Sequence, residues 1–379
     1  MANLFDYLKW RGDLSLEQTP INDIDSLILS RLSYLPFDGI VPPSCTDTIT
    51  IAEAARDLLN RETLEDELIM KADLPFLHEV GASRRFANMR LCGYTNQVDP
   101  NAEKQFAALV IRVAPLYSYV SYRGTDLSLA GWKEDFNMSF CTPVPAQIDA
   151  VTYLNEVATT LRGRLFVGGH SKGGNLAVYA AAFAKPEVQE RIVFVHNHDG
   201  PGFDACVLES EGYRRISERI KTFIPQSSVV GMLLQHEEDY YVVHSTQIGL
   251  MQHDLFSWEV DRDQFVYLDE VDEHSRFVDH TLKTWLTQVS PEQREQFVDA
   301  LFSILEETNA SSLKELTANW HKNAIIVLKS IRSMDDEMRH NISQALRLLF
   351  EAAKQTVRGS IQRNAPKPKF LQQRRPQKK

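Results

Sequence analysis

The feature that most constrains the fold is the stretch LFVGGHSKGGNLA, which runs from Leu165 to Ala177. An apolar run typical of a buried strand ends at Ser171, and glycines stand two residues before it and two after it, at Gly169 and Gly173. The helix-compatible run NLAVYAAAFA follows at once. Strand, Gly-x-Ser-x-Gly turn and helix in this order are typical of a nucleophile elbow, whose turn is too tight for side chains at the flanking positions. The pattern predicts a serine nucleophile above the N-terminus of a helix; the alternative is a glycine-rich turn that only lets the helix pack closely on the strand.

Strands and helices alternate along the chain around this stretch. Short β-branched and aromatic runs separated by turn residues begin at Arg90 and predict antiparallel strands. After Gly124 the predicted strands alternate with predicted helices, which is typical of a mostly parallel sheet with helices on both faces. We therefore expect an α/β fold with four parts. These are an N-terminal helical segment packed on the core (1–89), the α/β core (90–285), a C-terminal helical extension (286–353) and a basic, disordered tail (354–379).

The N-terminal segment contains a clear helical period. Apolar residues recur at spacings of three and four from Ile24 to Leu35, and Asn22 or Asp23 stands where a helix cap is preferred. This pattern predicts an amphipathic helix with one face against the core.

Charge and cysteine usage limit the partners and the compartment. The chain of 379 residues has a net charge of -10, although Lys354 to Lys379 holds nine basic residues and no acidic one. An acidic body is a poor nucleic-acid binder, so no nucleic-acid partner is expected, whereas the basic tail could contact an anionic membrane weakly. Charged residues interrupt the N-terminal segment where a secretory signal would need an apolar stretch, and no run approaches the ~18 apolar residues of a membrane span. The four cysteines lack a CxxC pair, so neither a zinc site nor a disulfide framework is indicated. We expect a cytoplasmic protein without a metal or organic cofactor.

Three segments together resemble a known family. SYRGTD (121–126), GWKEDF (131–136) and GGHSKGGNLA (168–177) resemble the pattern of class 3 lipases, and more closely a bacterial lipase-like family of unassigned function. The resemblance implies an α/β-hydrolase fold with Ser171 as the nucleophile. It also implies that Thr125 and the backbone of Lys172 bind the oxyanion and that Asp135 braces the oxyanion turn. The position of Thr125 agrees with this role because it follows a predicted strand end at Gly124, although these residues also suit an ordinary turn.

A serine needs a general base, which is normally a histidine oriented by a carboxylate. In class 3 lipases the base lies just before a final strand with an aromatic residue, and LMQHDLFSWEV (250–260) resembles that arrangement. The resemblance therefore selects His253. His244, within a strand pattern, is the second choice.

The acid departs from the family pattern. Class 3 lipases carry it just after the strand that corresponds to KTFIPQ (221–226), where this chain has Ser227 and Ser228. Either that corner of the site is uncharged or the acid comes from elsewhere. The nearest substitute by topology is Asp199, at the end of the preceding predicted strand, RIVFVHNHDG. Asp199 also suits a plain turn, because Asp-Gly is a turn signal.

Lys172 also departs from the small or apolar residue that usually follows the nucleophile, and we expect its ammonium to make the pocket rim cationic. A cationic rim suits an acidic ester or an anionic head group better than a neutral triglyceride. The expected function is cleavage of a carboxylic ester, of a small molecule or a lipid, through an acyl-enzyme on Ser171. The alternative is a binding or scaffold protein on a hydrolase fold that has lost full catalysis.

Overall fold

The computed structural model describes residues 1–99, 101–126, 129–138 and 142–273, together with scattered positions between 275 and 347. Most of the predicted C-terminal extension (286–353) and all of the predicted tail (354–379) lie outside these residues. The disorder of the tail and its contact with a membrane therefore stay predictions, as do the boundaries of the four parts.

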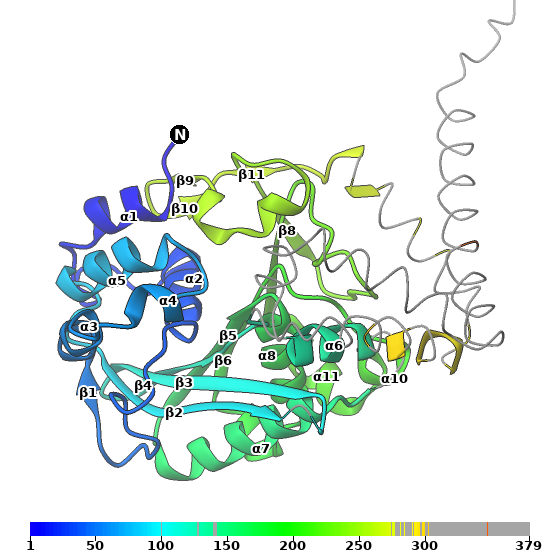
Figure 1. Cartoon of the computed structure of the whole chain (residues 1–379), viewed down its shortest axis with the longest axis horizontal. Helices are drawn as coiled ribbons and strands as arrows, with labels where there is room; N and C mark the ends of the chain where they lie inside the picture. The colour runs from blue at the N-terminus through cyan, green and yellow to red at the C-terminus, as the bar shows by residue number, and fades with distance from the viewer. Residues whose placement is uncertain are drawn as a thin grey trace, which may run out of the picture.

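A nine-stranded sheet forms the centre of the described part of the chain, in the order β1-β2-β3-β4-β5-β6-β7-β8-β11 (Figure 1). Its strands are β1 (Ile49–Thr50), β2 (Arg90–Asp99), β3 (Lys104–Ala114), β4 (Tyr117–Tyr122), β5 (Arg164–His170), β6 (Ile192–His198), β7 (Ile220–Pro225), β8 (Tyr240–Val243) and β11 (Tyr267–Leu268). β4 to β8 are parallel, whereas β1 to β4 and the pair β8 and β11 are antiparallel. β9 (Val260–Asp261) and β10 (Gln264–Phe265) form a separate ribbon. The predicted α/β-hydrolase fold, with antiparallel strands before a parallel series, is confirmed.

Helices cover both faces of this sheet (Figure 1). They are α1 (Leu4–Arg11), α2 (Asp23–Leu32), α3 (Ile51–Leu59), α4 (Leu64–Glu67), α5 (Asp73–Ala82), α6 (Leu129–Asn137), α7 (Pro145–Thr160), α8 (Lys172–Phe183), α9 (Pro186–Gln189), α10 (Ala205–Leu208) and α11 (Glu211–Ile216), with the 3-10 helices η1 (Ser217–Arg219), η2 (Gly249–His253) and η3 (Leu255–Ser257). None of the helices in the described ranges is both long and apolar enough to cross a bilayer.

The two faces of the sheet have separate apolar cores because successive strand residues point to opposite sides. Tyr119 and Phe166 belong to the core under the N-terminal helices, whereas their neighbours Val120 and Val167 belong to the core under α7 and α8. α2 packs across β4, β5 and β6. The edge above the carboxyl ends of these strands is where a site is expected in such a fold.

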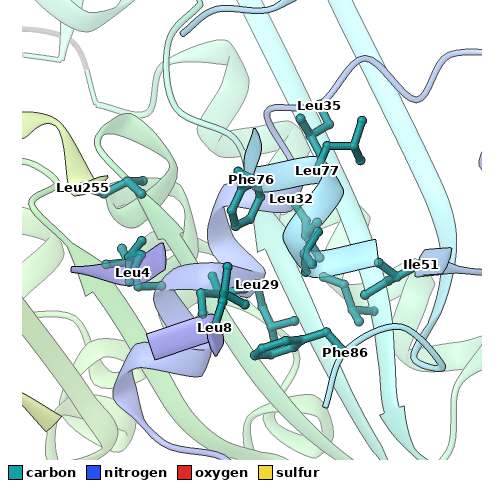
Figure 2. Close-up of a cluster of buried hydrophobic side chains, with 14 of the residues drawn as sticks. Leu4, Leu8, Leu29, Leu32, Leu35, Ile51, Phe76, Leu77, Phe86 and Leu255 are labelled. Carbon is teal, nitrogen blue, oxygen red and sulfur yellow. The ribbon is translucent and has the colours of Figure 1, made fainter. Parts of the chain in front are cut away.

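The N-terminal helices form a packed layer. A helix is confirmed here as α2, and Asn22 caps it through a capping box with Asp25. The predicted amphipathic character is wrong, because every residue of α2 except Asp23 is buried. Figure 2 shows the apolar cluster of this layer, in which leucines of α1, α2 and α5 meet Leu255 from η3. The layer also contains a fully buried ion pair between Arg85 and Asp25.

Candidate active site

The turn at Ser171 has the geometry of an elbow. β5 ends at His170 and α8 begins at Lys172, so the serine alone separates strand from helix. Its φ of 59° and ψ of -136° lie in a region that non-glycine residues rarely adopt. A Cβ at Gly169 would lie 2.2 Å from the carbonyl oxygen of Gly173, and a Cβ at Gly173 would lie 2.2 Å from that of Tyr122. Only glycine fits at both positions, and the predicted strand, tight turn and helix are confirmed.

The backbone after β4 passes directly beside this turn. A Cβ at Gly124 would lie 3.0 Å from the Cβ of Ser171. The next residue, Thr125, donates a short hydrogen bond from its hydroxyl to Oδ2 of Asp135 in α6. The structure therefore brings Gly124, Thr125 and Asp135 to the turn at Ser171, where the backbone N–H groups of Thr125 and Lys172 are candidate oxyanion donors.

The histidine and the carboxylate chosen from the sequence lie in contact. His253 ends η2, and its Nδ1 is 2.6 Å from Oδ2 of Asp199. Asp199 follows β6 with a positive φ of 54° and its side chain is 1% exposed, whereas that of His253 is 27% exposed. The backbone N–H of Ser171 donates to the carbonyl oxygen of His198 at 2.9 Å. This bond ties the elbow to the strand end that carries the carboxylate.

The sequence reasoning missed what holds Asp199. Ser228 donates its hydroxyl to Oδ1 of Asp199 at 2.5 Å, and the backbone N–H of Gly231 donates to the same oxygen at 3.2 Å. One of the two serines at the corner where class 3 lipases carry an acid is thus a donor to the relocated acid. The other, Ser227, bonds to Asp272. The sequence did contain one indication of this contact: two serines with hydroxyl donors follow β7, and β7 lies next to β6, the strand that Asp199 follows.

His244 lies in a different environment. Its Nδ1 is 2.6 Å from Oε2 of Glu259, and its backbone N–H donates to the carbonyl oxygen of Val266. The contact with Asp199 is made by His253.

A second histidine, His170, supports the loop that carries His253. Its Nε2 is 2.9 Å from the carbonyl oxygen of His253, its Nδ1 is 3.1 Å from the hydroxyl of Tyr34, and the two imidazole rings lie 4.5 Å apart. Burial lowers the pKa of His170 well below its ordinary value, and the neighbouring His253 lowers it further. A neutral ring that donates through Nε2 and accepts at Nδ1 satisfies both contacts. Tyr34 follows α2, so the N-terminal helices reach the site.

The expectation of a cationic rim at Lys172 is wrong. The Lys172 side chain is 1% exposed, and its ammonium is 2.8 Å from Oε2 of the fully buried Glu134 and 3.0 Å from the carbonyl oxygen of Gln105. The ammonium is buried because α6 places a carboxylate behind the elbow. That contact joins residues 38 positions apart, which no local pattern in the sequence reveals.

Two large apolar side chains shortly before His253 in the sequence are exposed, as are the polar residues Thr246 and Gln247. Ile248 is 82% exposed and Met251, within η2, is 62% exposed. Within the described ranges, no three His, Cys, Asp or Glu side chains are grouped so as to hold a metal ion.

Comparisons with known proteins add the following likenesses. A family model described as Mbeg1-like matches residues 80–303. No curated protein matches the chain. A solved mutant of MDLA from Penicillium cyclopium is 13% identical, with 66% of this chain and 88% of that chain covered at a TM-score of 0.38. M37 lipase is 14% identical, covering 56% and 70% at a TM-score of 0.35. Rhizomucor miehei lipase in its propeptide complex is 15% identical, covering 51% and 66% at a TM-score of 0.32.

Proposed function

The chain belongs to the lipase-like Mbeg1-like family, and we propose that it is a serine hydrolase that cleaves a carboxylic ester through an acyl-enzyme on Ser171. The observation that carries the proposal is the 2.6 Å contact between His253 Nδ1 and the buried carboxylate of Asp199, beside a serine held in a strained elbow. A buried carboxylate that accepts from one ring nitrogen fixes the tautomer and leaves the other nitrogen free as a base.

The proposed reaction follows from this arrangement. Asp199 accepts the Nδ1–H of His253, and Nε2 takes the proton of the Ser171 hydroxyl as the oxygen attacks the ester carbonyl. The backbone N–H groups of Thr125 and Lys172 donate to the resulting oxyanion. The imidazolium then gives its proton to the leaving alcohol, and water, activated by the same nitrogen, releases the acid and restores the serine.

The proposed substrate is a neutral ester with an apolar acyl group, of a small molecule or a lipid. Two features support this class over an acidic ester. The exposed Ile248 and Met251 lie five and two residues before His253, and the one cation next to the nucleophile in sequence, Lys172, is buried against Glu134. An apolar rim stabilises a bound acyl chain by about 0.8 kcal/mol for each buried methylene group.

The test is hydrolysis of a series of p-nitrophenyl esters with acyl chains of increasing length. We expect wild type to hydrolyse them, and Ser171→Ala, His253→Ala and Asp199→Ala to lose a factor of about 10⁴ or more in kcat. His244→Ala is the matched control and should retain its rate, because His244 contacts Glu259 instead of Asp199. A folded wild type without hydrolysis above the Ser171→Ala background would contradict the proposal and favour a binding or scaffold protein.

A further inference from the structure

A buried charge network lies behind the elbow. Glu134 is fully buried; it accepts hydrogen bonds from the backbone N–H groups of Gln105 and Ala146 and pairs with the ammonium of Lys172. That ammonium is also 3.8 Å from Oδ1 of Asp135. Asp135 Oδ1 is buried and has no hydrogen-bond partner within the described residues, while Asp135 Oδ2 accepts from the hydroxyl of Thr125. The network therefore runs from a buried ion pair to a side chain of the oxyanion turn.

The protonation state of Asp135 decides what the Thr125 hydroxyl can do. A hydroxyl has one hydrogen, and an ionised carboxylate only accepts. With Asp135 ionised, the hydrogen of the Thr125 hydroxyl is used in the bond to Oδ2 and is not available to a substrate oxygen. With Asp135 protonated, the acid can donate to Thr125 Oγ1, and the hydroxyl hydrogen is free to bind the oxyanion.

We propose that Lys172 is a positioning residue whose side chain, fixed by Glu134, keeps Asp135 ionised and so commits the Thr125 hydroxyl to Asp135. The oxyanion is then held by two backbone N–H groups, and protonation of Asp135 adds the Thr125 hydroxyl as a third donor. This inference rests on the proposed ester hydrolysis. It explains why a lysine stands directly after the nucleophile without reaching the rim.

The charged and titratable groups around Asp135 set the pH range. Burial raises the pKa of Asp135 to about 6, Lys172 in α8 opposes that rise, Glu134 in the same helix adds to it, and His253 of η2 opposes it. The charge of Asp135 also contributes to the raised pKa of Tyr34, whose hydroxyl lies next to Gly124. Removing the Lys172 cation is therefore expected to raise the pKa of Asp135 further.

The experiment measures how much the Thr125 hydroxyl contributes to catalysis at each pH. For each starting protein (the parent), kcat/KM for p-nitrophenyl ester hydrolysis is divided by kcat/KM of the same protein carrying Thr125→Val. This ratio is measured from pH 5 to 8. The titration of the base largely cancels in this ratio. In wild type the ratio should rise at least tenfold as the pH falls through about 6, since one oxyanion donor is worth about 10²–10³ in rate. In an Asp135→Asn parent, which cannot ionise, it should be the same at every pH.

The role of Lys172 is tested in a Lys172→Met/Glu134→Gln parent, which removes both buried charges and avoids leaving the carboxylate without its cation. The ratio should begin to rise at a higher pH than in wild type, because Lys172 affects Asp135 more than Glu134 does. If the pH at which this ratio is half-way through its rise is the same in the double variant as in wild type, the proposed role of Lys172 is overturned. A flat ratio in wild type overturns the whole inference, and this comparison with Asp135→Asn remains decisive if the double variant does not fold.

A second readout needs no catalysis. Between about pH 4 and 6 the Asp135 carboxyl is protonated in the folded chain but ionised in the unfolded chain, because folding raises its pKa. Its contribution to the free energy of unfolding is therefore fully present below about pH 4 and falls as the pH rises to about 6. The melting temperature of wild type relative to Asp135→Asn should fall across that range, and the fall should extend to higher pH in the double variant. If this fall is present in wild type and extends to higher pH in the double variant but no ester is cleaved, the proposed function fails while the control of Asp135 by Lys172 stands. If the fall is absent, or is the same in both proteins, the inference is overturned.

Discussion

The pairing of Asp199 with His253 depends on single hydrogen bonds at two neighbouring strand ends. Asp199 accepts from Ser228, from the backbone of Gly231 and from His253, so a nearly fully buried carboxylate has three donors. Burial of a carboxylate costs much less free energy when its oxygens accept hydrogen bonds in this way. Ser228, at the corner where the family resemblance places an acid, is thus one of the donors that hold the Asp199 carboxylate.

Replacing Ser228 by alanine should weaken catalysis without abolishing it. Loss of one hydrogen bond to a charged group costs about 1.5–3 kcal/mol, and we expect kcat to fall by about tenfold and the free energy of unfolding to fall by that amount. Ser227→Ala is the control, because the Ser227 hydroxyl bonds to Asp272 and not to Asp199. Ester hydrolysis and urea unfolding of both variants measure the two effects. Equal rates for the two variants would show that Ser228 does not support the acid.

At the scale of elements, the N-terminal helices act on the site through two contacts. Tyr34 bonds to His170, which in turn contacts the backbone of His253. Leu255, two residues beyond His253, is fully buried and belongs to the same apolar core as the leucines of α1, α2 and α5; Figure 2 shows it on the side of the cluster where Leu4 of α1 lies. These helices therefore fix the loop that carries the proposed base.

Truncation of Leu255 should affect both stability and rate. Leu255→Ala leaves a cavity and should cost about 2–5 kcal/mol, as should Leu77→Ala in the same core. Leu255 neighbours the base loop and Leu77 lies in α5, so Leu255→Ala should also lower kcat by about tenfold or more at a temperature where both variants are folded. Thermal melts and ester kinetics separate the two quantities. Matching kcat values would mean that the N-terminal core does not position the base.

Removal of the Tyr34 hydroxyl tests the other contact. Tyr34→Phe keeps the buried ring but removes the hydroxyl that contacts Nδ1 of His170 and donates to the carbonyl oxygen of the same residue, and we expect this loss to loosen the His253 loop and lower kcat several-fold. Tyr94→Phe is the control, because the Tyr94 hydroxyl bonds to Asp38 and to the carbonyl oxygen of Leu35 instead of to His170. A Tyr34→Phe enzyme as active as the Tyr94→Phe enzyme would argue against the supporting role of His170.

The elements could be predicted from the sequence where the determining pattern is local. The elbow follows from glycines two residues on either side of Ser171, and the start of α2 follows from the cap at Asn22. The partners of Lys172 and Asp199 could not be predicted, because both contacts join distant segments and depend on how α6 and the loop after β7 fold back. The family resemblance selected His253, and the expected strand order suggested Asp199. Their contact became visible only in the three-dimensional structure.

For the molecule as a whole, buried carboxylates connect the sheet to its surrounding elements. Glu238 accepts from Tyr213 of α11 at 2.6 Å and from Thr222 of β7 at 2.6 Å, and it contacts His236 at 3.0 Å. Burial alone would raise its pKa, but the hydrogen bonds and charge of His236 and the two hydroxyl donors lower the pKa to about 2. Folding therefore favours the ionised form of Glu238.

This depressed pKa predicts a loss of stability in acid. The contribution of Glu238 is present above its ordinary pKa of about 4.3 and is lost as the pH falls toward 2, because the unfolded chain then binds the proton first. The loss is on the order of 3 kcal/mol for a shift of about two pKa units. Melting temperatures of wild type and Glu238→Gln between pH 6 and 2.5 measure it. Wild type should lose its advantage over that range, and parallel curves would contradict the prediction.

The central claim is that Ser171 is an activated nucleophile paired with His253 and Asp199. Reaction of the purified full-length chain with a fluorophosphonate, followed by mass spectrometry of its peptides, tests this claim most directly, since the reagent phosphonylates a serine only where a base activates it. The account predicts one modified residue, Ser171, in wild type, no modification in Ser171→Ala, and reaction at least a hundredfold slower in His253→Ala and Asp199→Ala. A folded wild type that stays unmodified at Ser171, or that reacts equally fast without His253, would contradict it.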